Sequence, residues 1–110
     1  MKTLKYCKVR EVKSIARAHA DDAGIDFYVP TNLTVADMKP KMETTKNDLV
    51  VSVENGVITQ FMLQPGESVL IPSGIHVKVP TGYALIYFNK SGVASKKHLH
   101  VGACVVDENY

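Results

Sequence analysis

The chain has 110 residues, of which 45% are hydrophobic and 22% are charged, and its formal net charge is +2. This length fits one globular domain with a core of its own. The small net charge and the scattered basic residues argue against nucleic acid as a partner. No apolar run reaches membrane-spanning length. The charged N-terminus lacks the apolar stretch of a signal peptide, so we expect a cytoplasmic protein.

Short β-branched segments that alternate between apolar and polar residues dominate the sequence, and this pattern predicts strands. The segments are residues 4–9, 48–53, 56–63, 68–72, 75–80, 83–88 and 98–106. Asn55–Gly56 predicts a tight hairpin turn, because both central residues of a type I′ turn need positive φ. The helix formers in residues 14–22 are too few to anchor an α domain. We therefore expect one all-β domain over residues 1–110, built as a sandwich, barrel or jelly roll.

The first segment with chemical potential is residues 20–26, where three carboxylates surround Gly24. Such a group can contact Mg²⁺ through water, because that ion keeps several waters and needs few protein carboxylates. The spacing does not match a calcium loop. A helix cap by Asp22, or an ordinary acidic loop, explains the segment nearly as well.

Disulfides and tightly bound metals have little support in the sequence. Cys7 and Cys104 are far apart and lack metal-ligand spacing, which predicts buried, reduced thiols. His98 and His100 share one face of a strand, but a pair without a third ligand is usually structural. The polar, lysine-rich residues 36–48 predict an exposed loop that leads into the Asn55–Gly56 hairpin.

The segment Asn89–Gly92 follows a predicted strand and combines a cation, a hydroxyl and a glycine. Lys90 supplies a mobile positive charge, Ser91 a hydrogen-bond donor, and Gly92 a backbone that a ligand can approach closely. These are the features of a small anion site. A polar turn after the strand is the plainer interpretation of the segment taken alone.

The last six residues place Asp107 after an apolar strand and three positions before Tyr110. A carboxylate beside an aromatic ring suits a ligand with a planar base and phosphates that water attacks. A solvated turn is the alternative, because Asp and Asn are common turn residues.

Taken in order, three segments resemble the motifs of the trimeric all-β dUTPase family. ADDAGIDFY is similar to the first motif, FNKSGVA to the second, and VGACVVDENY to the opening of the third. LIPSGIHVKVPTGY, which precedes the second segment, fits the same family. The likeness runs from about Arg17 to the last residue, apart from residues 36–60, which read as an inserted loop and hairpin.

The resemblance implies a distorted jelly roll (β-clip) that forms a homotrimer and hydrolyses dUTP to dUMP and pyrophosphate with Mg²⁺. Asp107 would activate the water that attacks the α-phosphorus. Tyr110 would lie against the deoxyribose and exclude UTP. Lys90 and Ser91 would hold phosphate oxygens, and Asp26 would support the hydrated metal.

The resemblance also implies how the base is selected. Ala103, Cys104, Val105 and Val106 would form one arm of a hairpin whose backbone donors and acceptors match the edge of uracil. Cytosine would present mismatched hydrogen bonds, and the thymine methyl group would not fit.

The sequence departs from the family pattern at several places. Lys90 stands for an arginine, which replaces a bidentate fork by a point charge, and Asn89 stands for a proline. Asn109 and Cys104 also differ from the usual residues. The family's third motif continues past the tyrosine into a returning strand, a fourth motif and a glycine-rich tail. We therefore expect the 110 residues to lack C-terminal strands and tail, to have little or no activity, and to expose an unpaired strand edge.

Two other functions stay open. One is a non-catalytic jelly-roll module that assembles or binds partners through an exposed strand edge. The other is a relative of dCTP deaminase, which shares the fold. The second is weaker, because deamination in that group relies on a downstream glutamate and a Ser-Ser type motif, whereas Ser91 is followed by Gly92.

Overall fold

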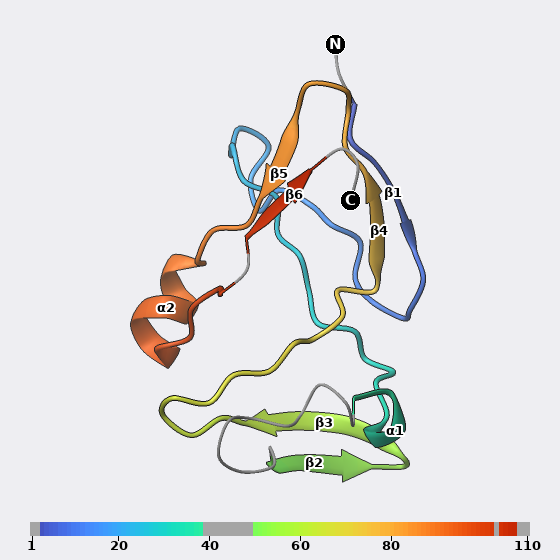
Figure 1. The fold of residues 1–110 in the computed structure, drawn as a ribbon, viewed down its shortest axis with the longest axis vertical. Coiled ribbons are helices and arrows are strands. Elements are labelled where there is room, and N and C mark those ends of the chain that lie inside the picture. Colours follow the sequence, from blue (N-terminus) through green and yellow to red (C-terminus); the bar gives the residue numbers. More distant parts are fainter. Residues whose placement is uncertain (1–2, 39–49, 103, 108–110) are drawn as a thin grey trace. The chain divides into compact units, whose positions relative to one another are not determined.

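The computed structural model describes residues 3–38, 50–102 and 104–107, and these are predominantly strand and loop (Figure 1). The strands are β1 Lys5–Lys8, β2 Val50–Glu54, β3 Val57–Met62, β4 Ile75–Lys78, β5 Ala84–Ile86 and β6 Val105–Asp107. The helices are α1 Val35–Met38 and α2 Ser91–Lys97. The strands pair in three two-stranded sheets, β1–β4, β2–β3 and β5–β6. The expected β class is confirmed at this level.

The chain divides into two compact units, which are described separately below. One unit comprises residues 8–76, and the other comprises residues 1–7 together with residues 77–110. The boundary falls within the paired strands β1 and β4.

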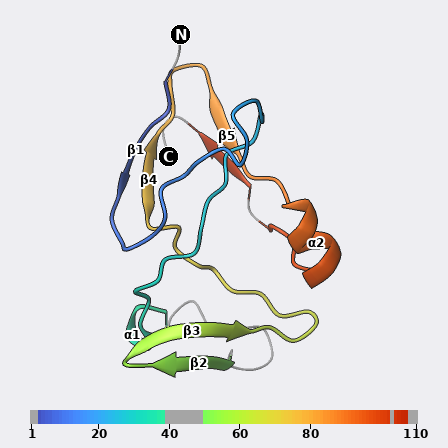
Figure 2. The same ribbon diagram turned by 180° about the vertical axis from the view of Figure 1, so that it is seen from behind.

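The β2–β3 hairpin in residues 8–76 confirms the predicted turn. Asn55 and Gly56 have φ values of 53° and 79°, the positive values that a type I′ turn needs. The strands pair antiparallel from Val50 opposite Met62 to Glu54 opposite Val57, with a bulge between Ser52 and Val53. Both ribbon views show α1 beside this hairpin (Figure 2).

The hydrophobic core of this unit lies between α1 and β3. Leu33, Met38 and Ile58 are almost completely buried, and the Ile58 N–H donates to the Leu33 carbonyl at 2.8 Å. Half-buried side chains from both strands and from the later loop pack against them, namely Val51, Phe61, Val69 and Ile71. The core therefore depends on α1 being held in place, although α1 has only four residues.

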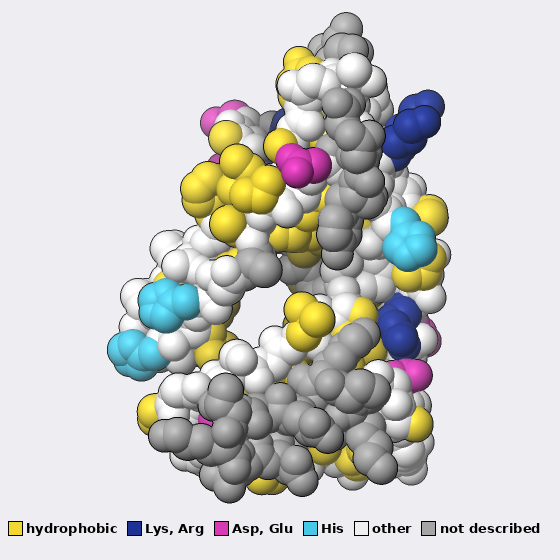
Figure 3. All heavy atoms as spheres, viewed as in Figure 1, with side chains coloured by type: hydrophobic (Ala, Val, Ile, Leu, Met, Phe, Trp, Pro, Cys, Tyr) yellow, Lys and Arg dark blue, Asp and Glu magenta, His cyan; other side chains and the backbone are white. Residues whose placement is uncertain are grey.

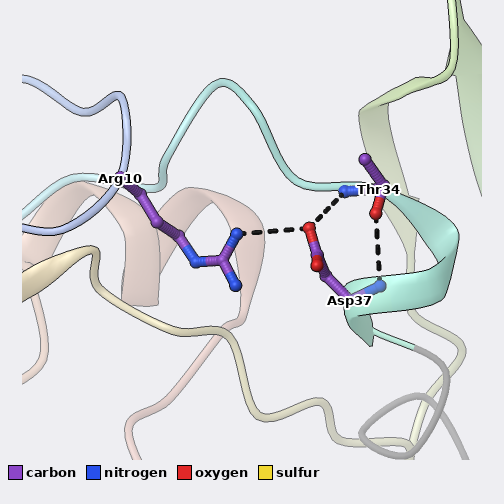
Figure 4. A network of polar contacts seen from close by, with 3 residues as sticks. All are labelled: Arg10, Thr34 and Asp37. Carbon is purple, nitrogen blue, oxygen red and sulfur yellow. Dashed lines mark hydrogen bonds and ion pairs between the residues drawn. The ribbon is translucent and has the colours of Figure 1, made fainter.

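Three polar side chains hold α1 at its first turn (Figure 4). The Asp37 N–H donates to Thr34 Oγ1, and the Thr34 N–H donates to Asp37 Oδ2, both at 3.2 Å. This reciprocal pair is a capping box, in which two otherwise unsatisfied N–H groups find partners. Arg10 Nη1 pairs with the same carboxylate oxygen at 3.2 Å. Hydrogen bonds from the Thr34 side chain and backbone, with Arg10 next, lower the pKa of Asp37 below its ordinary value.

The unit that contains residues 77–110 is built on the β5–β6 ladder and α2. Ala84 lies opposite Asp107, Leu85 opposite Val106, and Ile86 opposite Val105. The chain leaves β5, forms α2 and returns along β5 as β6 (Figure 1). The positive charges of Lys96 and Lys97 lie in the last turn of α2, where they interact favourably with the negative end of the helix dipole.

Several elements expected from the sequence differ in the structure. Residues 68–72 form no strand, although their alternation is real: Val69 and Ile71 are half-buried and Leu70 is exposed. The alternation reflects burial against the core rather than pairing with another strand. The expected strand over residues 98–106 begins only at Val105. The segment Asn89–Gly92, for which a polar turn was the alternative interpretation, instead contains the start of helix α2 at Ser91.

The expected exposed loop over residues 36–48 is wrong in its described part, because residues 36–38 belong to α1 and Met38 is buried, and residues 39–48 lie outside the described residues. The helix formers in residues 14–22 give a turn, in which the Asp22 N–H donates to the His19 carbonyl at 3.1 Å. Asp22 Oδ2 accepts the His19 N–H at 3.0 Å, so Asp22 closes a turn rather than capping a helix.

We predict that Gly74→Ala destabilises the protein more than Gly66→Ala does. Both glycines have positive φ, at 72° and 84°. A Cβ at Gly74 would lie 3.0 Å from Pro30 Cγ and 3.1 Å from Arg10 Cβ, whereas one at Gly66 would meet nothing within 4 Å. Strain alone costs about 1–2 kcal/mol, and crowding adds about 1–3 kcal/mol. Urea unfolding measures both losses, and equal losses would show that the crowding at Gly74 has no effect.

We also predict that Asp37→Asn removes a pH-dependent part of the stability. A carboxyl group whose pKa is lowered by folding stabilises the protein above its unfolded pKa of about 3.9 and loses this effect as the pH falls through the folded pKa. The difference in unfolding free energy between wild type and variant should be constant from about pH 7 to pH 5 and shrink below about pH 4. Glu54→Gln, which removes another exposed carboxylate, is the control, and a difference that persists at low pH would contradict the assignment.

Candidate functional site

The second-motif residues lie where the chain passes from β5 into α2. Lys90 has an extended backbone, with φ −78° and ψ 124°, and Ser91 is the first residue of α2. The Lys90 carbonyl accepts the Ala94 N–H at 2.8 Å, which is the first helical hydrogen bond. Lys90, Ser91 and Gly92 are all exposed, so they are accessible to a ligand.

The third-motif aspartate lies at the other end of the same hairpin. Asp107 pairs with Ala84, the first residue of β5, while Lys90 follows the strand's last paired positions. Extended chain advances roughly 3.3 Å per residue, so the six steps from Ala84 to Lys90 span about 20 Å. Asp107 and the Lys90–Ser91 segment therefore lie toward opposite ends of the β5–β6 ladder.

The β5–β6 register also shows which backbone groups of β6 face β5 and which point away from it. These are the groups that were expected to form hydrogen bonds with a base. The Tyr87 N–H donates to the Cys104 carbonyl at 2.7 Å. Hydrogen-bonded and non-hydrogen-bonded pairs alternate in an antiparallel ladder, so the backbone groups of Val106 also face β5. Those of Val105 and Asp107 point to the opposite edge of β6. Of the described residues in this arm, Val105 and Asp107 can therefore offer backbone hydrogen bonds to a ligand.

Two of the expected site residues, Ala103 and Tyr110, lie outside the described residues. Cys104 is described, and like Cys7 it is a free thiol. The expectation that the two cysteines are buried is wrong, because both are exposed. Cys7 lies in β1, and Cys104 directly precedes β6.

Asp26, the expected metal support, lies in the other unit and is half-buried. Its N–H donates to the Ala16 carbonyl at 2.8 Å and its carbonyl accepts the Ala16 N–H at 3.4 Å, which forms an isolated antiparallel bridge. This bridge fixes the backbone of the first motif. Within the described part of the chain, no group of three or more His, Cys, Asp or Glu side chains could enclose a metal ion.

An uncovered apolar surface adjoins Asp107. Ile86, Phe88 and Val105 are 48%, 81% and 60% exposed. Strand register places Ile86, Val105 and Asp107 on one face of the ladder, and Phe88 follows two residues after Ile86. We call the surface made by these four residues the Phe88 face. Figure 3 shows hydrophobic side chains at the surface of the molecule. Exposed apolar patches of this kind mark interaction sites.

The opposite face of the ladder is partly covered. Leu85, Tyr87 and Val106 are half-buried there. Burial raises the pKa of the Tyr87 hydroxyl above its ordinary value. Three side chains on one face of the hairpin are thus half-buried, whereas the face with Asp107 is open.

A polar contact that the sequence did not reveal joins the two arms of this hairpin. Asn89 Oδ1 accepts the Val101 N–H at 2.7 Å, and Asn89 Nδ2 lies 3.2 Å from His100 Nδ1. His100 therefore has a local structural partner, in agreement with its interpretation as a structural histidine. The available signal was an Asn directly after a strand, since such side chains readily bond to nearby backbone.

Comparison with protein-family models, characterised proteins and solved structures finds no match to this chain. The likeness to the dUTPase family therefore rests on the three sequence motifs. No helix in the described ranges is long and apolar enough to cross a membrane.

Proposed function

We propose that this protein hydrolyses dUTP to dUMP and pyrophosphate as a homotrimer of the all-β dUTPase type, with a distorted jelly-roll fold and a cytoplasmic location. The observation that carries the proposal is the position of the second and third motifs at opposite ends of the β5–β6 hairpin. That arrangement leaves each motif incomplete in one chain and suits a site built at a boundary between copies.

In the proposed reaction, Asp107 orients and deprotonates the water that attacks the α-phosphorus. It is exposed at the end of β6, so a substrate held by a neighbouring copy can reach it. Lys90 and Ser91 hold phosphate oxygens and stabilise the charge that develops in the transition state. Tyr110 lies against the deoxyribose and excludes a 2′-hydroxyl.

Mg²⁺ is the expected cofactor, and the described carboxylates suit an ion that arrives with the triphosphate. Mg²⁺ keeps several waters and uses one or two carboxylates together with substrate phosphates, so it does not need an enclosed protein cage. Asp26 would contact its waters. The ion would neutralise charge on the phosphates, which lowers the barrier to attack by water.

The proposed trimer is supported by the Phe88 face. A surface that exposes Phe88 and Val105 is costly in water, and a second copy would cover it at roughly 25 cal/mol for each Å² of apolar area. Covering this face would also bring Asp107 to a boundary between copies. The same exposed surface supports a second candidate function, a non-catalytic module that assembles without acting on nucleotides.

The test is pyrophosphate release from dUTP and from UTP. We expect only slow release by these 110 residues, from dUTP and not from UTP, and we expect Asp107→Asn to reduce this slow rate about 10²–10⁴-fold, because a positioned general base is worth that much. Glu11→Gln, which removes an exposed carboxylate outside the three motifs, should leave the rate unchanged. Binding of a non-hydrolysable dUTP analogue is measured alongside, since a weak hydrolase still binds its substrate.

Two results would count against this proposal. A chain that assembles but binds neither dUTP nor the analogue is the assembly module instead. An Asp107→Asn variant with full turnover would show that another group activates the water.

A further inference from the structure

The side chain of Asn89 continues the β5–β6 pairing beyond the point where the backbone ladder ends. The last backbone bond across the hairpin among the described residues joins the Tyr87 N–H to the Cys104 carbonyl at 2.7 Å. Two positions further on, Asn89 Oδ1 accepts the Val101 N–H, also at 2.7 Å. The amide oxygen thus acts in place of a backbone carbonyl.

The donors and acceptors of this contact are fixed by the backbone. The Val101 N–H can only donate, so the atom facing it must be the Asn89 oxygen, and the amide NH₂ must face His100. That NH₂ group donates, so His100 Nδ1 accepts at 3.2 Å and the ring proton resides on Nε2. Asn89, His100 and Val101 form one satisfied set, which we call the Asn89 clamp.

The clamp lies directly before the second-motif residues. Asn89 precedes Lys90, and the Lys90 carbonyl accepts the first hydrogen bond of α2 from the Ala94 N–H at 2.8 Å. α2 has seven residues, includes Gly92 and buries none of its side chains. A helix this short is not stable by itself in water, and helices in proteins are usually stabilised by packing of an apolar face. The position of α2 must therefore be set at its ends.

We propose that Asn89 is a positioning residue that fixes the Lys90–Ser91 backbone relative to the β5–β6 ladder. The restraint that Asn89 places on the position of α2 is inferred from these hydrogen bonds alone. The consequence for phosphate binding rests on the proposed function of Lys90 and Ser91.

The experiment compares Asn89→Leu, which removes both clamp bonds, with Asn89→Asp, which keeps an acceptor for Val101. Hydrogen exchange followed by NMR should show the Val101 and Ala94 amides exchanging about tenfold faster in Asn89→Leu, because one lost hydrogen bond is worth about that factor. Asn89→Asp should stay within about threefold of wild type at both amides. Gln60→Leu on β3 controls for loss of an exposed amide.

A second, milder variant tests the clamp in case Asn89→Leu does not fold. His100→Phe keeps the bond to Val101 and removes the acceptor for Nδ2, so exchange at Val101 should rise about threefold. Affinity for a non-hydrolysable dUTP analogue should fall about tenfold in Asn89→Leu and recover in Asn89→Asp.

Wild-type exchange rates at Val101 in both Asn89→Leu and His100→Phe would overturn the clamp. Faster exchange at Val101 with an unchanged Ala94 amide would overturn its positioning of α2. Expected exchange rates in a protein that does not bind the analogue would keep the clamp and refute the proposed dUTP site, so the two failures are distinguishable.

Discussion

The register of the β5–β6 ladder is the constraint on which the proposed site depends. Because Ala84 pairs with Asp107, the aspartate lies beside the start of β5. Lys90 and Ser91 follow the end of β5. This separation, about 20 Å when the chain is fully extended, is the reason why the proposed site combines the two motifs from different copies. The clamp at Asn89 and the bond between Tyr87 and Cys104 hold that register at the α2 end of the hairpin.

The small buried core is the second constraint. Among the described residues, the buried hydrophobic side chains are Val12, Leu33, Met38, Ile58, Ile75 and Val79, and five of these six lie in residues 8–76. The described strands pair only in twos, and an isolated two-stranded sheet is marginal in water. Phe88, which is 81% exposed, is a large apolar side chain that the described residues leave uncovered. Association of copies would supply the missing burial and would also complete the site.

Local signals in the sequence predicted the parts of the fold that depend on local chemistry. The Asn55–Gly56 turn was predictable because few residues other than Gly and Asn accept its positive φ. The inward positions Val69 and Ile71 were also predictable, but alternation does not reveal whether a strand has a partner, so residues 68–72 were wrongly expected to pair. Helix α2 was missed because Gly92 and the serines are weak helix formers. The exposure of the two cysteines was not predicted, because the burial of a strand residue depends on whether another layer of the fold packs against it.

A mixture of two inactive variants tests the shared site most directly. Ser91→Ala damages the second motif and Asp107→Asn the third, so neither chain alone forms an intact site. When the two variants assemble at random in equal amounts, about one site in four draws both intact residues from different copies, and dUTP turnover should recover to about a quarter of the wild-type rate. Equal mixtures that form mixed trimers yet stay as inactive as their parents would contradict the account.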